Sequence, residues 1–190
     1  MQKFINYIQQ FSLLTDNEIE IISKNVCIEK IPAKSFILEA GQICQRIGFL
    51  LDGVIRSYYY DTHGKEIIKC FHTENQFAVD LLSYQKGITS NDYVQTITNC
   101  EFVFIYKSSD EYLSNNIEKW PILVRKISDT LLSEKIKKRT ILFHEDAKER
   151  YLSFLKEYPE IIRTVPLGQI ASFLGIAQQS LSRIRKELVS

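Results

Sequence analysis

The chain has 190 residues, of which 45% are hydrophobic and 25% are charged. This is the composition of an ordinary globular protein, and it excludes an intrinsically disordered chain. No run of 18 apolar residues occurs, which argues against a membrane-spanning helix, and the polar N-terminal segment argues against a signal peptide. The four cysteines are widely spaced (Cys27, Cys44, Cys70 and Cys100), so we expect reduced thiols in a cytoplasmic protein.

The formal net charge of +1 hides an asymmetry between two parts of the chain. Residues 1–134 hold 13 Lys/Arg against 17 Asp/Glu, a net charge of −4, whereas residues 135–190 hold 11 against 6, a net charge of +5. A basic segment can bind a polyanion through counterion release. The last third of the chain is therefore a candidate for contact with nucleic acid, and an ordinary solvated surface is the alternative.

Two short helices are predicted at the N-terminal end. Residues 1–25 carry apolar side chains at three- and four-residue spacing, which is typical of amphipathic helices. Thr15 and Asp16, followed by Glu18, form a helix-start signal. We therefore expect the second helix to begin at this point.

Residues 26–107 have the pattern of a β domain. Short runs rich in Ile, Val, Phe, Tyr and Thr are separated by turn residues such as Asp52-Gly53. The runs 54–60 and 66–71 flank a loop that contains Gly64, which predicts a β-hairpin. Many short strands at near-regular spacing indicate a barrel, a roll or a sandwich.

Residues 108–190 return to helical spacing. A long helix is expected around residues 116–142, because apolar residues recur every three or four positions before the sequence becomes strongly polar. Such a helix is a natural dimerisation element, and packing within the same chain is the alternative. The residues that we expect at a dimer interface are Leu123, Val124, Ile127 and Leu131.

Catalytic and metal-binding motifs are not found in the sequence. The three histidines (His63, His72 and His144) lie far apart, and the cysteines offer no Cys-x-x-Cys spacing for zinc. No phosphate-binding loop, dinucleotide fingerprint or nucleophile elbow occurs. We therefore expect no metal, no cofactor and no catalytic residue, and we do not expect an enzyme.

The last 26 residues have the pattern of a helix-turn-helix. Ile170 and Leu174 would form the inner face of the first helix, and Ala171 is small enough for the second helix to pack against it. Gly175 stands at the turn, where a positive φ favours glycine. The inner face of the second helix is expected to carry Leu181, Ile184 and Leu188.

The outer face of the second helix is expected to read DNA. Its side chains are hydrogen-bonding or basic groups, which suit base edges and phosphates. The alternative is a helical hairpin with a solvated polar face. The candidate DNA-binding residues are Gln178, Gln179, Ser182, Arg183, Arg185 and Lys186.

With the β segment in front of it, this arrangement resembles the Crp/Fnr family of bacterial transcription regulators over nearly the whole chain. Residues 39–41, 48–56 and 63–67 match the turn glycines and strands of the family's cyclic-nucleotide-binding roll, and residues 77–94 fall at its phosphate-binding cassette. The resemblance implies an α+β fold that begins with a β-roll of the double-stranded β-helix or jelly-roll type.

The resemblance also implies a domain organisation and partners. The roll would occupy residues 1–115, the dimerisation helix residues 116–142, and a winged-helix-like helix-turn-helix domain residues 143–190. The implied protein is a cytoplasmic homodimer that regulates transcription by binding a near-palindromic DNA operator. The resemblance implies RNA polymerase as a further partner, and it implies no binding to a membrane.

The residues at the nucleotide site depart from the family pattern. Cyclic-nucleotide binders present a Gly-Glu pair, whose Glu holds the ribose, and an Arg-Ser pair, whose Arg holds the cyclic phosphate. The corresponding positions here read Val79-Asp80 and Ser90-Asn91. Without the Arg the charge-assisted phosphate contact is lost, and Asp92 would repel a phosphate. We therefore expect a degenerate effector pocket that binds neither cAMP nor cGMP, with any other effector unidentified.

A second hypothesis comes from a different functional class. The chain could be a ligand-sensing or protein-interaction module whose helix-turn-helix is vestigial. A vestigial helix would not be expected to keep Arg183, Arg185 and Lys186 beside Gln178 and Gln179. The outer face of the second helix therefore favours the DNA-binding hypothesis.

Overall fold

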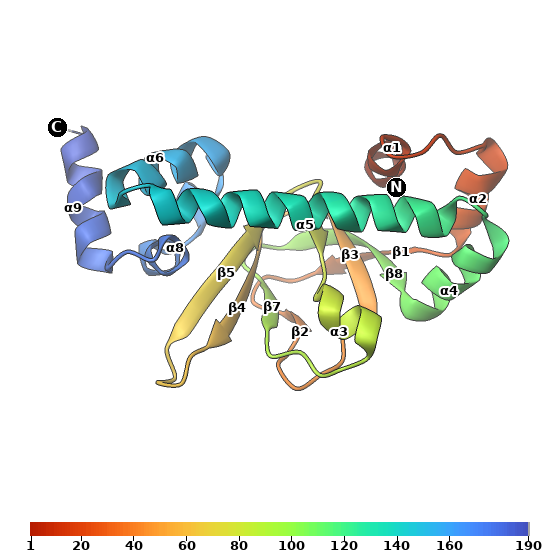
Figure 1. Cartoon of the computed structure of the whole chain (residues 1–190), viewed down its shortest axis with the longest axis horizontal. Helices are drawn as coiled ribbons and strands as arrows, with labels where there is room; N and C mark the ends of the chain where they lie inside the picture. The colour runs from red at the N-terminus through yellow and green to blue at the C-terminus, as the bar shows by residue number, and fades with distance from the viewer. Residues whose placement is uncertain (190) are drawn as a thin grey trace.

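The computed structural model describes the backbone of residues 1–189 and their side chains apart from those of residues 134, 135, 137–144 and 189. An N-terminal helical pair is followed by two β-sheets, a long helix and a group of C-terminal helices (Figure 1). Among the described residues, no helix is long and apolar enough to cross a membrane.

The N-terminal helices form where the sequence predicts them. They are α1 (Gln2–Gln9) and α2 (Asp16–Lys24). The Thr15 side chain accepts a hydrogen bond from the Glu18 N–H, and the Glu18 carboxylate accepts one from the Thr15 N–H at 2.7 Å. This reciprocal capping satisfies backbone donors at the start of α2.

The β domain consists of two four-stranded antiparallel sheets. The strand orders are β1-β8-β3-β6 and β2-β7-β4-β5, so β5 lies at an edge of the second sheet. The predicted hairpin is confirmed, since β4 pairs with β5 in antiparallel register. The strands are β1 (Cys27–Ile31), β2 (Phe36–Leu38), β3 (Arg46–Asp52), β4 (Ile55–Tyr60), β5 (Glu66–His72), β6 (Phe77–Ala78), β7 (Tyr93–Thr96) and β8 (Cys100–Tyr106).

The two sheets enclose an apolar interior, which confirms the predicted roll. Leu50, Phe102 and Phe104 are fully buried there, and the rings of Phe102 and Phe104 stack with centroids 4.9 Å apart. A short helix, α3 (Leu81–Lys86), interrupts the strands after β6. Along β8, Phe102 and Phe104 face this interior, whereas Val103 and Ile105 are buried on the other face, in a cluster with α1 and α5.

Two helices connect the roll to the C-terminal part. They are α4 (Lys107–Asn116) and α5 (Trp120–His144). α5 runs along the long axis of the molecule from α4 to the C-terminal helices (Figure 1). The Trp120 indole N–H donates to the Asp110 carboxylate at 2.8 Å, which ties the start of α5 to α4. The expected long helix over residues 116–142 thus begins four residues later and ends two residues later.

The apolar stripe of α5 packs within the chain. Leu123 is fully buried and Ile127 is 8% exposed, both in one cluster with Phe4 and Ile8 of α1. Val124 and Leu131 are half-buried. Leu123 and Ile127 therefore pack within one chain, as the alternative to dimerisation predicts, because the N-terminal helices and the roll cover them.

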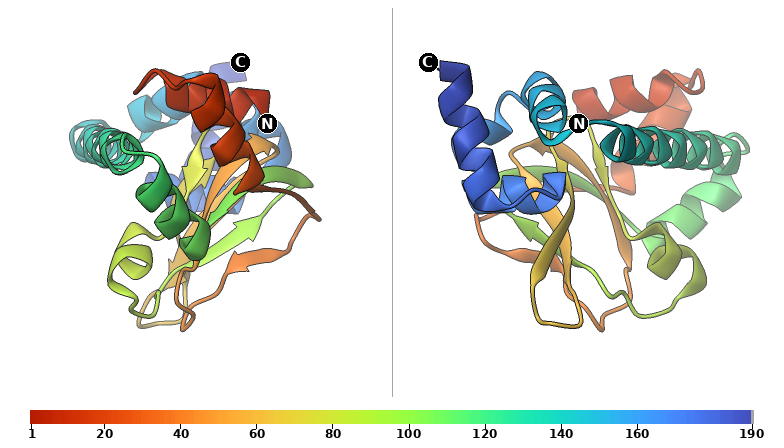
Figure 2. Two further views of the ribbon diagram at one scale, coloured as in Figure 1. Left: turned by 90° about the vertical axis from the view of Figure 1, so that its right-hand side faces the viewer. Right: turned by 60° about the vertical axis from the view of Figure 1, so that its left-hand side comes forward.

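The C-terminal part consists of helices joined by short loops, and its described residues form no strand. Asp146 caps the first of its helices by accepting the N–H groups of Lys148 and Glu149 at 2.8 and 2.9 Å. Figure 2 shows these helices gathered around one end of α5, beside the β4–β5 hairpin. The helices are α6 (Ala147–Glu157), α7 (Ile161–Thr164), α8 (Leu167–Leu174) and α9 (Gln178–Val189).

Candidate functional site

The turn between α8 and α9 has the geometry that the sequence predicts for a helix-turn-helix. Gly175 ends α8 in the left-handed conformation, with φ +65°. The N–H of Ile176 then donates to the Ala171 carbonyl at 2.9 Å, which closes the turn. Ala171 and Leu181 are buried where α8 and α9 cross. The small side chain of Ala171 allows the close approach of the two helices.

The inner face of α9 is less completely covered towards its C-terminal end. Leu181 is fully buried, Ile184 is half-buried and Leu188 is 38% exposed. The spacing of three and four residues places these side chains on one face of the helix, as the sequence predicts. The burial of that face decreases along α9.

The candidate DNA-binding residues share one accessible region of α9. Ser182 is half-buried, and the other five are exposed. α9 lies at one end of the molecule, with α8 between it and the roll (Figure 1). The residues in the accessible region are Gln178, Gln179, Ser182, Arg183, Arg185 and Lys186.

Arg150 of α6 is a structural residue of this domain that the sequence does not reveal. Its guanidinium donates to the Leu174 carbonyl at 2.7 Å, at the C-terminal end of α8. A cation at this end also interacts favourably with the helix dipole. The spacing of 24 residues between Arg150 and Leu174 leaves no local pattern that would predict the contact.

A cavity of about 230 Å³ lies in the roll at the position of the expected effector pocket. Of the residues that line it, two are charged, Arg46 and Asp80. Most of the others are apolar or amide side chains. The lining residues are Ile37, Leu38, Gln42, Ile43, Cys44, Gln45, Arg46, Ala78, Val79, Asp80, Val94 and Tyr106.

Only two of the four predicted pocket residues line the cavity. Val79 and Asp80 line the cavity. Ser90 is buried and donates to the Asp80 carboxylate at 2.6 Å, while the second oxygen of Asp80 accepts the Ser83 N–H at the start of α3. Asn91 is exposed. The structure therefore brings Asp80 and Ser90 into contact and leaves Asn91 outside.

Arg46, which the sequence reasoning missed, is already paired. Its guanidinium donates to Glu29 and lies within 3.1 Å of the Tyr106 hydroxyl, and it stacks over the Phe104 ring at 4.0 Å. Burial and the hydrogen bond to Glu29 raise the pKa of Tyr106. The Tyr106 hydroxyl donates to the Glu29 carboxylate at 2.8 Å. The positive charge of Arg46 is therefore paired with a carboxylate of the same chain.

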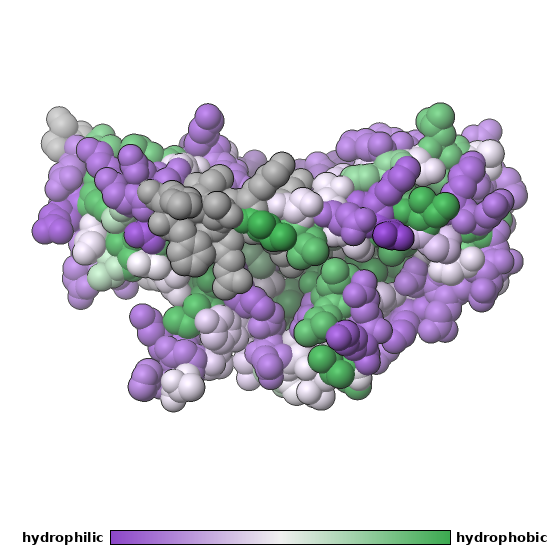
Figure 3. Space-filling model, in the orientation of Figure 1, coloured by the Kyte–Doolittle hydropathy of each residue, from purple (hydrophilic) through white to green (hydrophobic). Residues whose placement is uncertain are grey.

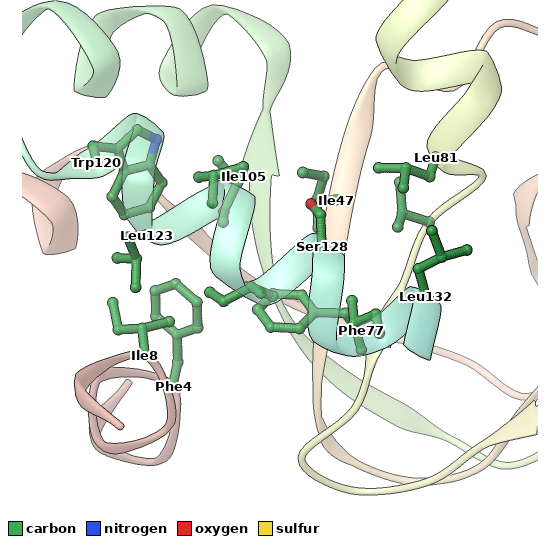
Figure 4. Close-up of a pocket in the computed structure, with 14 residues that line it drawn as sticks. Phe4, Ile8, Ile47, Phe77, Leu81, Ile105, Trp120, Leu123, Ser128 and Leu132 are labelled. Carbon is green, nitrogen blue, oxygen red and sulfur yellow. The ribbon is translucent and has the colours of Figure 1, made fainter. Parts of the chain in front are cut away.

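A second cavity, of about 130 Å³, lies between α5, α1 and the roll. Figure 4 shows Phe4 and Ile8 of α1, Ile47 of β3 and Leu123 of α5 around it. Its lining is apolar except for Ser128. Apolar surface, drawn green in Figure 3, gathers beside α5 where the helix passes the roll.

The described residues contain no group of three His, Cys, Asp or Glu side chains that could hold a metal ion. His72 lies within 3.2 Å of the Cys70 sulfur, and His63 belongs to the exposed turn between β4 and β5. His144 lies outside the described side chains.

Comparison with known proteins relates the chain to bacterial transcription regulators. No protein-family model matches it. The cAMP-activated global transcriptional regulator CRP of Haemophilus influenzae is 25% identical, over 85% of this chain and 76% of the relative. The same regulator from Salmonella typhimurium is 23% identical, over 92% of this chain and 88% of the relative.

Solved structures share the fold. A Crp/Fnr-family regulator from Eubacterium rectale superposes with a TM-score of 0.73 at 16% identity, over 96% of this chain and 87% of that one. FixK2 from Bradyrhizobium japonicum gives 0.72 at 17% identity, over 86% and 84% of the two chains. The chain is thus similar in sequence to CRP over most of its length, and it shares the fold of Crp/Fnr-family regulators.

Proposed function

We propose that this protein is a homodimeric, sequence-specific DNA-binding regulator of transcription whose roll does not bind cAMP or cGMP. It acts in the cytoplasm on a near-palindromic operator, with RNA polymerase as a further partner and without catalytic activity. The observation that carries the proposal is the accessible row of polar and basic side chains on α9, held by a correctly formed helix-turn-helix. Its homologues are transcription regulators, which supports the same function.

Some side chains of α9 suit contacts with bases in a major groove, and others suit contacts with phosphates. Gln178 and Gln179 at the start of the helix can bond adenine, and Arg183 one turn later can make two bonds to guanine. Ser182, Arg185 and Lys186 suit phosphates, which fix the position of the helix on the duplex. The net charge of +5 on residues 135–190 adds the long-range attraction that a polyanion needs.

A second copy of the chain is the occupant that we propose for the surface along α5. Leu132 and Ile136 remain 53% and 59% exposed on a helix whose other face is buried. They continue the apolar surface that Val124 and Leu131 begin at the second cavity. Two parallel α5 helices would cover these side chains and would place the two α9 helices on the same side of the dimer.

The internal contacts of the roll support the loss of nucleotide binding. The charges of Arg46 and Asp80 in the pocket are each engaged by the chain's own groups, Glu29 and Ser90. The ammonium of Lys69 pairs with Asp92. A cyclic phosphate entering the pocket would find no unpaired cation among the residues that line it, and it would lie near the Asp80 carboxylate. Isothermal titration that gives a micromolar Kd for cAMP would contradict this part of the proposal.

The DNA-binding proposal is tested by selecting sites from a random duplex pool. We expect the wild type to enrich a near-palindrome with half-sites about one helical turn apart. Arg183→Ala should weaken binding by about 1–3 kcal/mol and relax one base position in each half-site. Arg163→Ala is the matched control, because Arg163 is an exposed arginine of the same domain that lies on α7.

The phosphate contacts are tested by binding at several salt concentrations. Lys186→Ala should weaken binding to all sequences alike and reduce the salt dependence by about one unit of slope. The selection itself decides between the two hypotheses. A wild type that enriches no motif would support the alternative of a ligand-sensing or protein-interaction module. An unchanged motif for Arg183→Ala would show that α9 does not read bases as proposed.

A further inference from the structure

A serine hydroxyl of the helix-turn-helix makes hydrogen bonds to the roll. Ser172 Oγ of α8 accepts the Ile68 N–H at 3.1 Å and lies 3.2 Å from the Glu66 carbonyl, to which it donates. Both groups belong to β5, an edge strand of its sheet. An edge strand presents backbone groups with no strand partner, and a hydroxyl can serve a donor and an acceptor at once. Ser172 therefore occupies the place of a neighbouring strand at this point.

The next residue extends this contact into an apolar one. The Phe173 ring lies 5.4 Å from the ring of Phe71 on β5 and 5.7 Å from that of Phe154 on α6. Ile68 and Phe71 are buried in the same cluster as Ala171 and Leu181. Side chains of the roll thus form part of the core of the helix-turn-helix, which fixes the orientation of α8 on the hairpin.

The contact leaves the candidate DNA face accessible. α8 lies between α9 and β5 (Figure 1). Gln178, Gln179 and Arg183 are exposed. Docking on the hairpin therefore orients α9 without covering it. A dimer that reads two half-sites gains affinity when its two helices are held at the required separation beforehand, because less freedom is lost on binding.

We propose that Ser172 and Phe173 are positioning residues that hold α9 in a DNA-competent orientation, so that the chain binds its operator without a small-molecule effector. This inference rests on the proposed function. It assigns to the interface between α8 and β5 the role of setting the helix orientation. The internally paired roll pocket agrees with it, since no ligand is then required there.

The test compares a full palindromic site with a single half-site, both taken from the selected pool and measured with ligand-free protein. Ser172→Ala removes two hydrogen bonds, which corresponds to about a tenfold loss in affinity for the full site. Half-site affinity should stay within about twofold, because one α9 is enough to bind it. Ser172→Thr retains the hydroxyl and should restore full-site binding. Ser114→Ala is the matched control, since this hydroxyl bonds only the Asp110 carbonyl of its own helix α4 among the described contacts.

Docking itself is measured without DNA, by hydrogen exchange of the Ile68 amide. Exchange should accelerate in Ser172→Ala and not in Ser114→Ala. Unchanged exchange, an unchanged full-site affinity, or a parallel loss at the half-site would each overturn the positioning role. A wild type that binds its site only after a small molecule is added would overturn effector independence. If the wild type binds no DNA while Ile68 exchange responds as expected, the proposed function is wrong and the positioning role falls with it.

Discussion

Gly53 occupies the turn between β3 and β4 with a φ of +103°. A Cβ at this position would lie 2.6 Å from both the Asn99 carbonyl oxygen and the Cys100 sulfur. We expect Gly53→Ala to destabilise the protein by about 2–4 kcal/mol, from backbone strain and overlap together. Gly64→Ala is the control, because Gly64 also has a positive φ but has no atom within 4 Å of its added Cβ. Its cost should be about 1 kcal/mol in chemical denaturation, and equal costs would contradict the role of the close contact.

The ionisation of Tyr58 makes the stability of the fold depend on pH. Its ring stacks on Tyr93 with centroids 5.1 Å apart, and burial, followed by the nearby Tyr60, raises its pKa to about 12. The neutral form is favoured in the folded state, while the unfolded chain ionises near the ordinary pKa of about 10. The stabilisation is therefore complete below pH 10 and is lost as the pH rises from 10 towards 12.

This linkage predicts a difference between the wild type and Tyr58→Phe. The free energy of unfolding of the wild type should fall by about 2 kcal/mol more than that of Tyr58→Phe between pH 10 and 12. Urea denaturation at a series of pH values measures it. Tyr59→Phe is the control, because Tyr59 is an exposed tyrosine of the same strand. Parallel curves for the wild type and Tyr58→Phe would contradict the raised pKa.

At the scale of the element, the apolar side chains of α5 fall into two groups. Leu123 and Ile127 are buried against α1 and the roll, whereas Leu132, at the second cavity, and Ile136 are exposed. Substitutions in the two groups should therefore have different consequences. A charge in the buried group disrupts the fold of one chain, whereas a charge in the exposed group acts on association.

We expect Leu132→Lys combined with Ile136→Lys to give folded monomers in sedimentation velocity. Ile127→Lys should instead destabilise the chain by several kcal/mol, about the cost of burying an unpaired charge. Leu152→Lys is the control for the double variant, because Leu152 is an exposed leucine on α6. A folded dimer that survives the double substitution would place the interface elsewhere.

At the scale of the molecule, the roll and the C-terminal helices share one core. Val54, Tyr58, Ile68 and Phe71 of the roll are buried together with side chains from α6, α8 and α9. The shared cluster joins two parts that α5 also connects. Unfolding of the two parts is therefore expected to be coupled.

The single tryptophan provides a test of this coupling. Trp120 is buried in a different cluster, with α1 and the start of α5, so its fluorescence reports on that end of the molecule. Wild-type unfolding should give coincident curves for fluorescence and far-ultraviolet circular dichroism. Phe71→Ala should cost about 3–5 kcal/mol and should shift the dichroism curve ahead of the fluorescence curve. Separate curves in the wild type would contradict the coupling.

The sequence alone determined the local features. The capping signal at Thr15, the hairpin around Gly64 and the turn at Gly175 were predicted correctly, because each depends on a few neighbouring residues whose backbone preferences are strong. The order of helices, strands and helices, and the substituted residues at Val79 and Asp80, could also be read from the chain directly.

The tertiary structure decided which surface each element meets. Periodicity marked an apolar stripe on α5 but did not show that α1 and the roll cover Leu123 and Ile127. It placed Leu188 on the inner face of α9 but did not show that this side chain stays 38% exposed. The pairing of Arg46 with Glu29 and the contact of Ser172 with β5 join residues 17 and more than 100 positions apart. Spacing along a chain encodes the face of a helix or strand, but the partner of that face is fixed only when distant segments pack together.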